Sequence, residues 1–147
     1  RQIVSSLYGT VAGKKIGFLG WAFKKDTNDT RESAAIYIAD KLIEEQALIQ
    51  VYDPKVTAVQ MHSDLNGLNT RTELENDKFL NIHNNPYEAL EGAHALAVIT
   101  EWDEFKFYDW NKIYDAMQKP AFVFDGRNIL DQQKLEAIGF IYKAIGR

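Results

Sequence analysis

Residues 17–33 decide the fold, and they read Gly-Phe-Leu-Gly-Trp-Ala-Phe-Lys-Lys-Asp-Thr-Asn-Asp-Thr-Arg-Glu-Ser. The stretch begins as an apolar strand, turns on glycine and crosses a basic loop. It is then expected to enter a helix through residues 29–32, where Asp29 and Glu32 have the spacing of a capping box. The first N–H groups of a helix lack partners and carry partial positive charge, so they attract anions. Further positive charge comes from Lys24, Lys25 and Arg31. The stretch therefore predicts a phosphate-bearing ligand.

Composition narrows the class of protein. The chain has 147 residues, the size of one domain, with 46% hydrophobic and 26% charged residues. No apolar stretch approaches the roughly 20 residues that span a bilayer, and no signal peptide is visible, so we expect no membrane partner. The net charge of −4 and the lack of a basic stripe argue against nucleic acid. The absence of cysteine fits a reducing, cytoplasmic setting.

Apolar runs alternate with helical patterns along the chain. Strands are expected at 16–19, 48–52, 95–99, 121–124 and 140–145, and helices at 33–45, 86–91, 111–118 and 132–138. Residues 57–81 are interpreted as a short helix followed by a variable excursion. Residues 1–11 resemble the end of a helix, which suggests that something precedes them. The pattern predicts an α/β, Rossmann-like, doubly wound and mainly parallel sheet with helices on both faces.

Polar side chains follow four of the expected strands. In open parallel sheets, ligands bind beyond the carboxyl ends of the strands, so these loops should converge on one edge. The candidates, in chain order, are Lys24, Lys25, Asp26 and Arg31, then Asp53, then Thr100, Glu101, Trp102 and Asp103, and finally Asp125, Arg127 and Asn128.

Each cation also has an interpretation without a ligand. Lys24 and Lys25 could be solvated loop lysines. Arg31 could pair with Asp26 or Asp29, and the ion-pair alternative for Arg127 is Asp125. Arginine nevertheless offers a planar fork that suits phosphate or carboxylate, which keeps both arginines as candidates.

A nicotinamide site within this chain has weak support. Asp53 stands where a dinucleotide fold places its ribose-binding carboxylate, but the glycine pattern is Gly17-x-x-Gly20 instead of Gly-x-Gly-x-x-Gly. Asp53 is therefore interpreted as a turn-former before Pro54. The three tryptophans are expected as core or interface anchors. The three histidines lack metal-ligand spacing, so no metal site is expected.

Together these motifs resemble the C-terminal UDP-binding domain of the UDP-glucose/GDP-mannose dehydrogenase family. The segments that carry the resemblance are Gly20–Thr27, Asp29–Ser33, Tyr52–Pro54, Thr100–Phe105 and Lys119–Arg127. The likeness extends over nearly the whole chain except about Ala58–Asn84. The Thr-Glu-Trp and Phe-Asp-Gly-Arg segments favour the UDP-glucose 6-dehydrogenase branch.

The resemblance implies an enzyme that oxidises UDP-glucose to UDP-glucuronate in two hydride-transfer steps with NAD⁺. It implies that Phe23, Lys24 and Arg127 contact the nucleotide sugar, and that Arg31 reaches the NAD⁺ held by an N-terminal domain. Residues 1–12 would end the inter-domain connecting helix, and 13–147 would form the C-terminal UDP-sugar-binding domain. The intact enzyme would be a homo-oligomer, a dimer or a hexamer.

One departure from the family concerns catalysis. The family's catalytic cysteine has no counterpart here, because the chain contains no cysteine. The chain is therefore interpreted as a fragment without catalytic residues of its own, inactive alone. Trp21 also stands where many relatives have phenylalanine or another apolar residue. The alternatives are a related dehydrogenase of GDP-mannose or UDP-N-acetylmannosamine, and a non-catalytic nucleotide-binding module. A phospho-acceptor receiver domain is disfavoured by the basic first loop.

Overall fold

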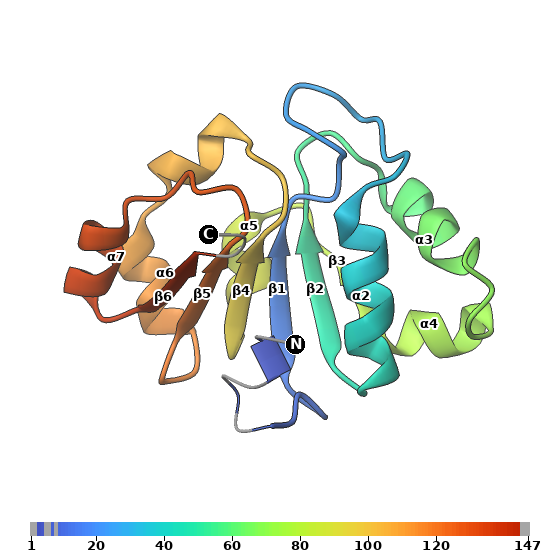
Figure 1. Ribbon diagram of the computed structural model, residues 1–147, viewed down its shortest axis with the longest axis horizontal. Coiled ribbons are helices and arrows are strands. Elements are labelled where there is room, and N and C mark those ends of the chain that lie inside the picture. Colours follow the sequence, from blue (N-terminus) through green and yellow to red (C-terminus); the bar gives the residue numbers. More distant parts are fainter. Residues whose placement is uncertain (1–2, 5–6, 8, 145–147) are drawn as a thin grey trace.

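The protein folds around one parallel β-sheet, as a computed structural model that describes residues 3–4, 7 and 9–144 shows (Figure 1). Within these residues the strand order is β3-β2-β1-β4-β5-β6, and every neighbouring pair is parallel. The strands are β1 (Lys15–Leu19), β2 (Leu48–Tyr52), β3 (Leu80–Ile82), β4 (Ala95–Val98), β5 (Phe122–Asp125) and β6 (Ile141–Ala144). The order reverses between β1 and β4, which confirms the doubly wound α/β prediction.

Helices cover both faces of the sheet. Figure 1 shows α2, α3 and α4 on the near side and α5 and α6 behind the strands. The helices are α2 (Ala34–Glu44), α3 (Ala58–Asn66), α4 (Glu73–Phe79), α5 (Pro86–Leu90), α6 (Trp110–Ala116) and α7 (Gln132–Ile138), with a 3₁₀ turn η1 (Asp103–Phe107). Because both faces are covered, β4 and β5 are buried along their whole length and consist almost entirely of apolar residues. Trp21, Trp102 and Trp110 are also buried, as expected for anchors.

The first long helix begins within one residue of its predicted start, but the capping box predicted ahead of it is wrong. α2 begins at Ala34, and Ser33 is its N-cap, accepting a hydrogen bond from the Ala35 N–H. Glu32 has a φ of 58°, a left-handed conformation that no helical residue adopts, so the expected capping box with Asp29 does not form. Asp29 instead accepts a hydrogen bond from the Arg31 N–H in a local turn. The basic loop is therefore longer than the sequence pattern indicated.

Residues 57–81 hold more structure than predicted. Two helices, α3 and α4, replace the single short helix, and α4 has the capping box between Thr72 and Glu75. The strand β3 then extends the edge of the sheet beside β2. A three-residue edge strand carries too short a pattern to be recognised by its periodicity.

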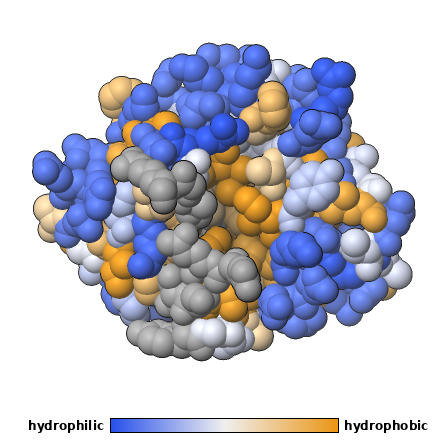
Figure 2. All heavy atoms as spheres, in the orientation of Figure 1, coloured by the Kyte–Doolittle hydropathy of each residue, from blue (hydrophilic) through white to orange (hydrophobic). Residues whose placement is uncertain are grey.

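An apolar groove lies beside α2 on the near face of the sheet. It encloses about 350 Å³ and is lined by Ile3, Ala34, Ile38, Ala97, Val98, Ile99, Phe124, Gly126 and Arg127. Figure 2 shows hydrophobic side chains gathered in the middle of this face and hydrophilic ones around it. Arg127 brings one end of the groove to the carboxyl edge of the sheet.

The first residues are only partly described. Ile3 and Val4 are helical, and Ile3, Leu7 and Val11 are buried against the core. The prediction of a helix up to residue 11 is wrong, because Leu7 and Gly9 lie in turns, with Gly9 at a φ of 80°, and residues 10–11 are not helical; residues 1, 2, 5, 6 and 8 lie outside the described residues. In the part of the chain that the structure describes, no helix is long and apolar enough to cross a membrane.

Candidate functional site

The loop after β1 is anchored by a buried carboxylate from the neighbouring strand. Asp53 directly follows β2, and its Oδ2 accepts hydrogen bonds from the backbone N–H groups of Trp21 (2.7 Å) and Ala22 (3.0 Å). The N–H of Gly20 is bound to the Tyr52 carbonyl at 2.8 Å. The first three residues of the loop are thus tied to the end of β2.

Two side-chain hydroxyls bind the backbone carbonyl groups of the same loop. The Ser33 hydroxyl donates to the Trp21 carbonyl (2.6 Å), and the Thr100 hydroxyl donates to the Ala22 carbonyl (2.8 Å). Both hydroxyls are buried with their residues. The Phe23 N–H donates to the carbonyl of Asp29 at 2.8 Å, which closes the loop on itself. The backbone of residues 20–23 is therefore fixed before any ligand arrives.

Arg127 connects the β5 loop to the same segment. Its Nε donates to the Ile99 carbonyl (2.8 Å), and its Nη2 donates to the Phe23 carbonyl (2.9 Å). Its Nη1 lies 3.6 Å from the carboxylate of Glu101, which also accepts the Lys25 N–H at 2.6 Å. The Arg127 side chain remains 35% exposed, so part of the guanidinium faces solvent. Arg127 and Glu101 thus hold the outer half of the loop.

Two side chains project from this fixed backbone. Phe23 is 46% exposed, which is unusual for a large apolar residue on a rigid loop. Lys24 is exposed and forms no hydrogen bond or ion pair with any residue that the structure describes. The adjacent Lys25 differs, because its ammonium lies 3.5 Å from Asp103 and its charge lowers the pKa of that carboxyl. Lys24 is consequently the cation of this loop that is available to an anion.

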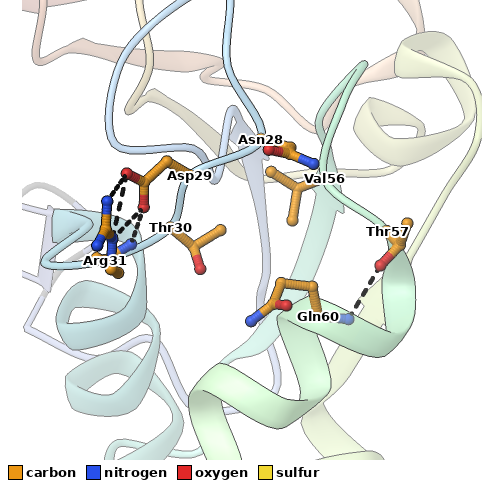
Figure 3. Close-up of a pocket in the computed structure, with 7 residues that line it drawn as sticks. All are labelled: Asn28, Asp29, Thr30, Arg31, Val56, Thr57 and Gln60. Atoms are coloured by element: carbon orange, nitrogen blue, oxygen red, sulfur yellow. Dashed lines mark hydrogen bonds and ion pairs between the residues drawn. The ribbon is translucent and has the colours of Figure 1, made fainter.

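Arg31 lies further along the loop, beside a polar cavity (Figure 3). Its guanidinium donates to both carboxylate oxygens of Asp29, and these hydrogen bonds lower the pKa of Asp29 to about 2. The Arg31 side chain is nevertheless 88% exposed. The cavity of about 280 Å³ is lined by Asn28, Asp29, Thr30, Arg31, Val56, Thr57 and Gln60.

The usual dinucleotide position at this sheet edge is filled by protein. A Cβ on Gly20 would meet the Thr100 side chain at 2.3 Å, so the glycine turn approaches Thr100 instead of a pyrophosphate. The Asp53 carboxylate is committed to N–H groups and is not free to accept ribose hydroxyls. NAD⁺ therefore does not fit the β1–α2 turn of this domain. Within residues 3–4, 7 and 9–144 there is likewise no group of three or more His, Asp or Glu side chains that could hold a metal ion.

The structure brings Phe23, Lys24 and Arg127 together at the carboxyl edge of the sheet, and Arg31 is connected to them through Asp29, whose carbonyl accepts the Phe23 N–H. Of the ion-pair alternatives, the one between Arg31 and Asp29 is correct. The one between Arg127 and Asp125 is wrong, because Asp125 accepts the N–H groups of Arg127 and Leu130 and the hydroxyl of Tyr142. The expected turn at Asp53 is confirmed by its bonds to the N–H groups of Lys55 and Val56.

The sequence did not reveal that Ser33, Thr100 and Glu101 hold the loop. Thr100 and Glu101 lie 78 and 76 residues from their backbone partners in the chain. The sequence indicated only that Thr100 and Glu101 directly follow an apolar run, and so lie at the carboxyl end of an expected strand.

Comparisons with known proteins agree with this geometry. The profile of the "UDP-glucose/GDP-mannose dehydrogenase family, UDP binding domain" matches residues 17–132. UDP-glucose 6-dehydrogenase 1 of Arabidopsis thaliana is 47% identical over 156 residues, which cover 99% of this chain and 32% of that protein. UDP-glucose 6-dehydrogenase of Drosophila melanogaster is 47% identical over 148 residues, covering 100% of this chain and 31% of its own length.

A solved structure supports the fold. The NDP-N-acetyl-D-galactosaminuronic acid dehydrogenase of Methanosarcina mazei Go1 superposes with a TM-score of 0.76 at 24% identity, over 99% of this chain and 27% of that one. The present chain spans about a third of the length of the curated relatives that it matches.

Proposed function

Because this chain belongs to the UDP-glucose/GDP-mannose dehydrogenase family, as a UDP binding domain, we propose that it grips the nucleotide end of UDP-glucose in an NAD⁺-dependent UDP-glucose 6-dehydrogenase. The complete enzyme oxidises the C6 alcohol of the sugar to the carboxylate of UDP-glucuronate in two hydride transfers. The identity of 47% to UDP-glucose 6-dehydrogenases over the whole chain favours this branch of the family.

One observation carries the proposal. An exposed lysine that forms no hydrogen bond or ion pair with the described residues stands on a loop whose backbone is bound on both sides of it, next to a partly exposed arginine. A diphosphate is the ligand that such a pair suits, because lysine supplies a point charge and arginine a planar fork. Phe23 offers an apolar surface beside the same cations. These three residues are the proposed substrate-binding residues.

The role of the domain is to position the substrate. Holding the diphosphate far from C6 fixes the alcohol in the reactive orientation, and binding energy from remote groups can then lower the barrier of the chemical step. NAD⁺ supplies the hydride acceptor when it is bound by the N-terminal domain. Arg31, which is largely exposed, reaches across to that cofactor. The chain contains no cysteine, so it does not supply a catalytic cysteine nucleophile.

The proposal extends to the organisation of the whole protein. Residues 1–12, of which Ile3 and Val4 are helical, contain the end of the helix that connects the two domains, and residues 13–147 form the UDP-sugar-binding domain. The enzyme is a cytoplasmic homo-oligomer whose subunits each contain an NAD-binding domain. Neither a membrane nor a nucleic acid is a partner.

Two measurements test the proposal. Calorimetric titration of this chain with UDP should give saturable binding, whereas GDP at the same concentration should bind more weakly. The complete protein should form NADH from UDP-glucose, at two NADH per sugar, and not from GDP-mannose. NADH formation from GDP-mannose alone would assign the chain to the other branch of the family. Absence of binding and of turnover, in protein shown to be folded, would reject the proposal.

A further inference from the structure

Asp53 has the most heavily used carboxylate among the described side chains of the site. Its Oδ1 accepts the N–H groups of Lys55 (2.8 Å) and Val56 (3.1 Å). Its Oδ2 accepts those of Trp21 (2.7 Å) and Ala22 (3.0 Å) and the indole Nε1–H of Trp102 (3.2 Å). The residue is 7% exposed. A buried carboxylate requires such a set of donors, because desolvation would otherwise disfavour its charge.

These five donors come from three separate loops. Trp21 and Ala22 belong to the loop after β1, Lys55 and Val56 to the turn after β2, and Trp102 to the segment after β4. One carboxylate therefore joins the carboxyl ends of three neighbouring strands. Trp21 and Ala22 lie three and two residues before Lys24, so their bonds to Asp53 restrict where Phe23 and Lys24 can point.

The geometry is specific for aspartate. Both oxygens accept at least two hydrogen bonds, so an asparagine would have to place its NH₂ group against N–H donors on one side. Glutamate carries one more methylene and cannot keep both oxygens at these distances within a packed site. Asp53→Asn therefore removes hydrogen bonds to the loop and keeps the volume of the side chain.

We propose that Asp53 is a positioning residue for nucleotide-diphosphate binding. It does not contact the ligand; it acts through the backbone of residues 21–22 to hold Phe23 and Lys24 in their binding orientation. The inference rests on the proposed function of the same site. It goes further because Asp53 stands where a dinucleotide fold places its ribose-binding carboxylate, and here that carboxylate orders the loop that binds the substrate.

Asp64, on helix α3, provides a matched control that contacts the same loop. Its Oδ2 accepts the indole Nε1–H of Trp21 at 3.0 Å, and its Oδ1 accepts the Gln60 side chain at 2.7 Å. Asp64→Asn thus perturbs the side chain of Trp21 and leaves the backbone bonds of the loop intact. Comparison with Asp53→Asn separates a general loosening around Trp21 from the loss of backbone positioning.

The experiment compares the wild type, Asp53→Asn and Asp64→Asn in the complete protein. Circular dichroism and thermal unfolding establish a temperature at which all three are folded, and UDP titration and steady-state kinetics are then done there. We expect Asp53→Asn to raise the Kd for UDP and the KM for UDP-glucose at least tenfold, with the KM for NAD⁺ within twofold of wild type. Asp64→Asn should change all three constants by less than threefold.

Different failures point to different conclusions. If the wild type neither binds UDP nor oxidises UDP-glucose, the proposed function fails. If the wild type does both and folded Asp53→Asn keeps its UDP affinity within threefold, Asp53 only stabilises the fold and the positioning role is overturned. An equal loss of affinity in Asp64→Asn also overturns it.

A second measurement applies even where Asp53→Asn does not fold. Amide hydrogen exchange of the wild type should show residues 21 and 22 protected to the level of β1, whether or not UDP is present, because Asp53 already holds them. Exchange of these two amides at the rate of an open loop, or protection that arises only when UDP is added, contradicts a preformed site held by Asp53.

Discussion

Replacing Lys24 by methionine is expected to weaken UDP binding and to leave the fold unchanged. Lys24 is exposed and forms no hydrogen bond or ion pair with a described residue, and its charge is the weakest of the causes that lower the pKa of Asp29, so its ammonium contributes little to the folded state. Methionine keeps an unbranched stem of similar length and removes only the charge. The backbone at this point is held by the bonds of its neighbours and not by the lysine side chain.

The structure sets the size of the two effects. Surface substitutions away from specific interactions change stability by less than about 0.5 kcal/mol. In a domain of this size that corresponds to a shift in Tm of about 2 °C or less. A hydrogen bond to a charged group contributes about 1.5–3 kcal/mol. Since Lys24 is exposed and screened by solvent, we expect the lower end of that range, which is about a tenfold rise in the Kd for UDP.

Calorimetric titration with UDP at two salt concentrations measures the effect. The difference in Kd between wild type and Lys24→Met should shrink at higher salt, because screening weakens the contact that the variant lacks. Lys134→Met, which removes an exposed lysine on α7, is the matched control and should bind UDP like the wild type. An unchanged Kd for Lys24→Met, an equal loss in Lys134→Met, or a fall in Tm of more than about 4 °C would refute the reasoning.

Three further variants have different signatures. Arg127→Ala should lower both UDP affinity and stability, the latter by about 1–3 kcal/mol in urea unfolding, because two backbone carbonyls lose their donor; unchanged stability would contradict this. Gly20→Ala should destabilise the domain by more than about 2 kcal/mol, because φ is +102° and the new Cβ would lie 2.3 Å from the Thr100 hydroxyl oxygen; near-wild-type Tm would argue against that close approach. Burial lowers the pKa of His94, whose Nδ1 accepts the Lys15 N–H, so the unfolded chain takes up its proton first and stability should fall as the pH drops below about 6.5. His94→Gln should make the pH dependence of unfolding shallower, and an identical slope would exclude His94 as its source.

The elements that the sequence predicted correctly share a physical property. β4 and β5 are buried on both faces and so consist of uninterrupted apolar residues, which makes them recognisable without any partner. β3 is short and lies at the edge, so neither its length nor its pattern distinguishes it. The N-cap of α2 was misassigned because Asp29 and Glu32 have the spacing of a capping box, whereas Ser33 is the N-cap and also donates to the Trp21 carbonyl.

The sequence also predicted only part of the candidate site. The cations could be located because they follow strands, and the fold brings the carboxyl ends of parallel strands to one edge. Their partners could not be predicted, because Arg127 could equally have paired with Asp125, two positions away, and it contacts Glu101 instead. A local charge pattern predicts an ion pair with the acidic residue nearest in sequence. In the folded chain, the partner depends on the direction in which each loop leaves its strand.

The glycine turn and the carboxylate that bind the cofactor in a dinucleotide fold make contacts within the protein in this domain. Thr100 fills the space beside the glycine turn, and Asp53 is turned inward onto N–H groups. In the proposed function the anion binds instead at the loop after β1, where Lys24 and the exposed part of Arg127 lie. Because Phe23, Lys24 and part of Arg127 are exposed, a second protein surface is needed to exclude water from a ligand bound to them. A loop that is rigid before binding suits such a site, because no ordering entropy remains to be lost when the two surfaces close on the ligand.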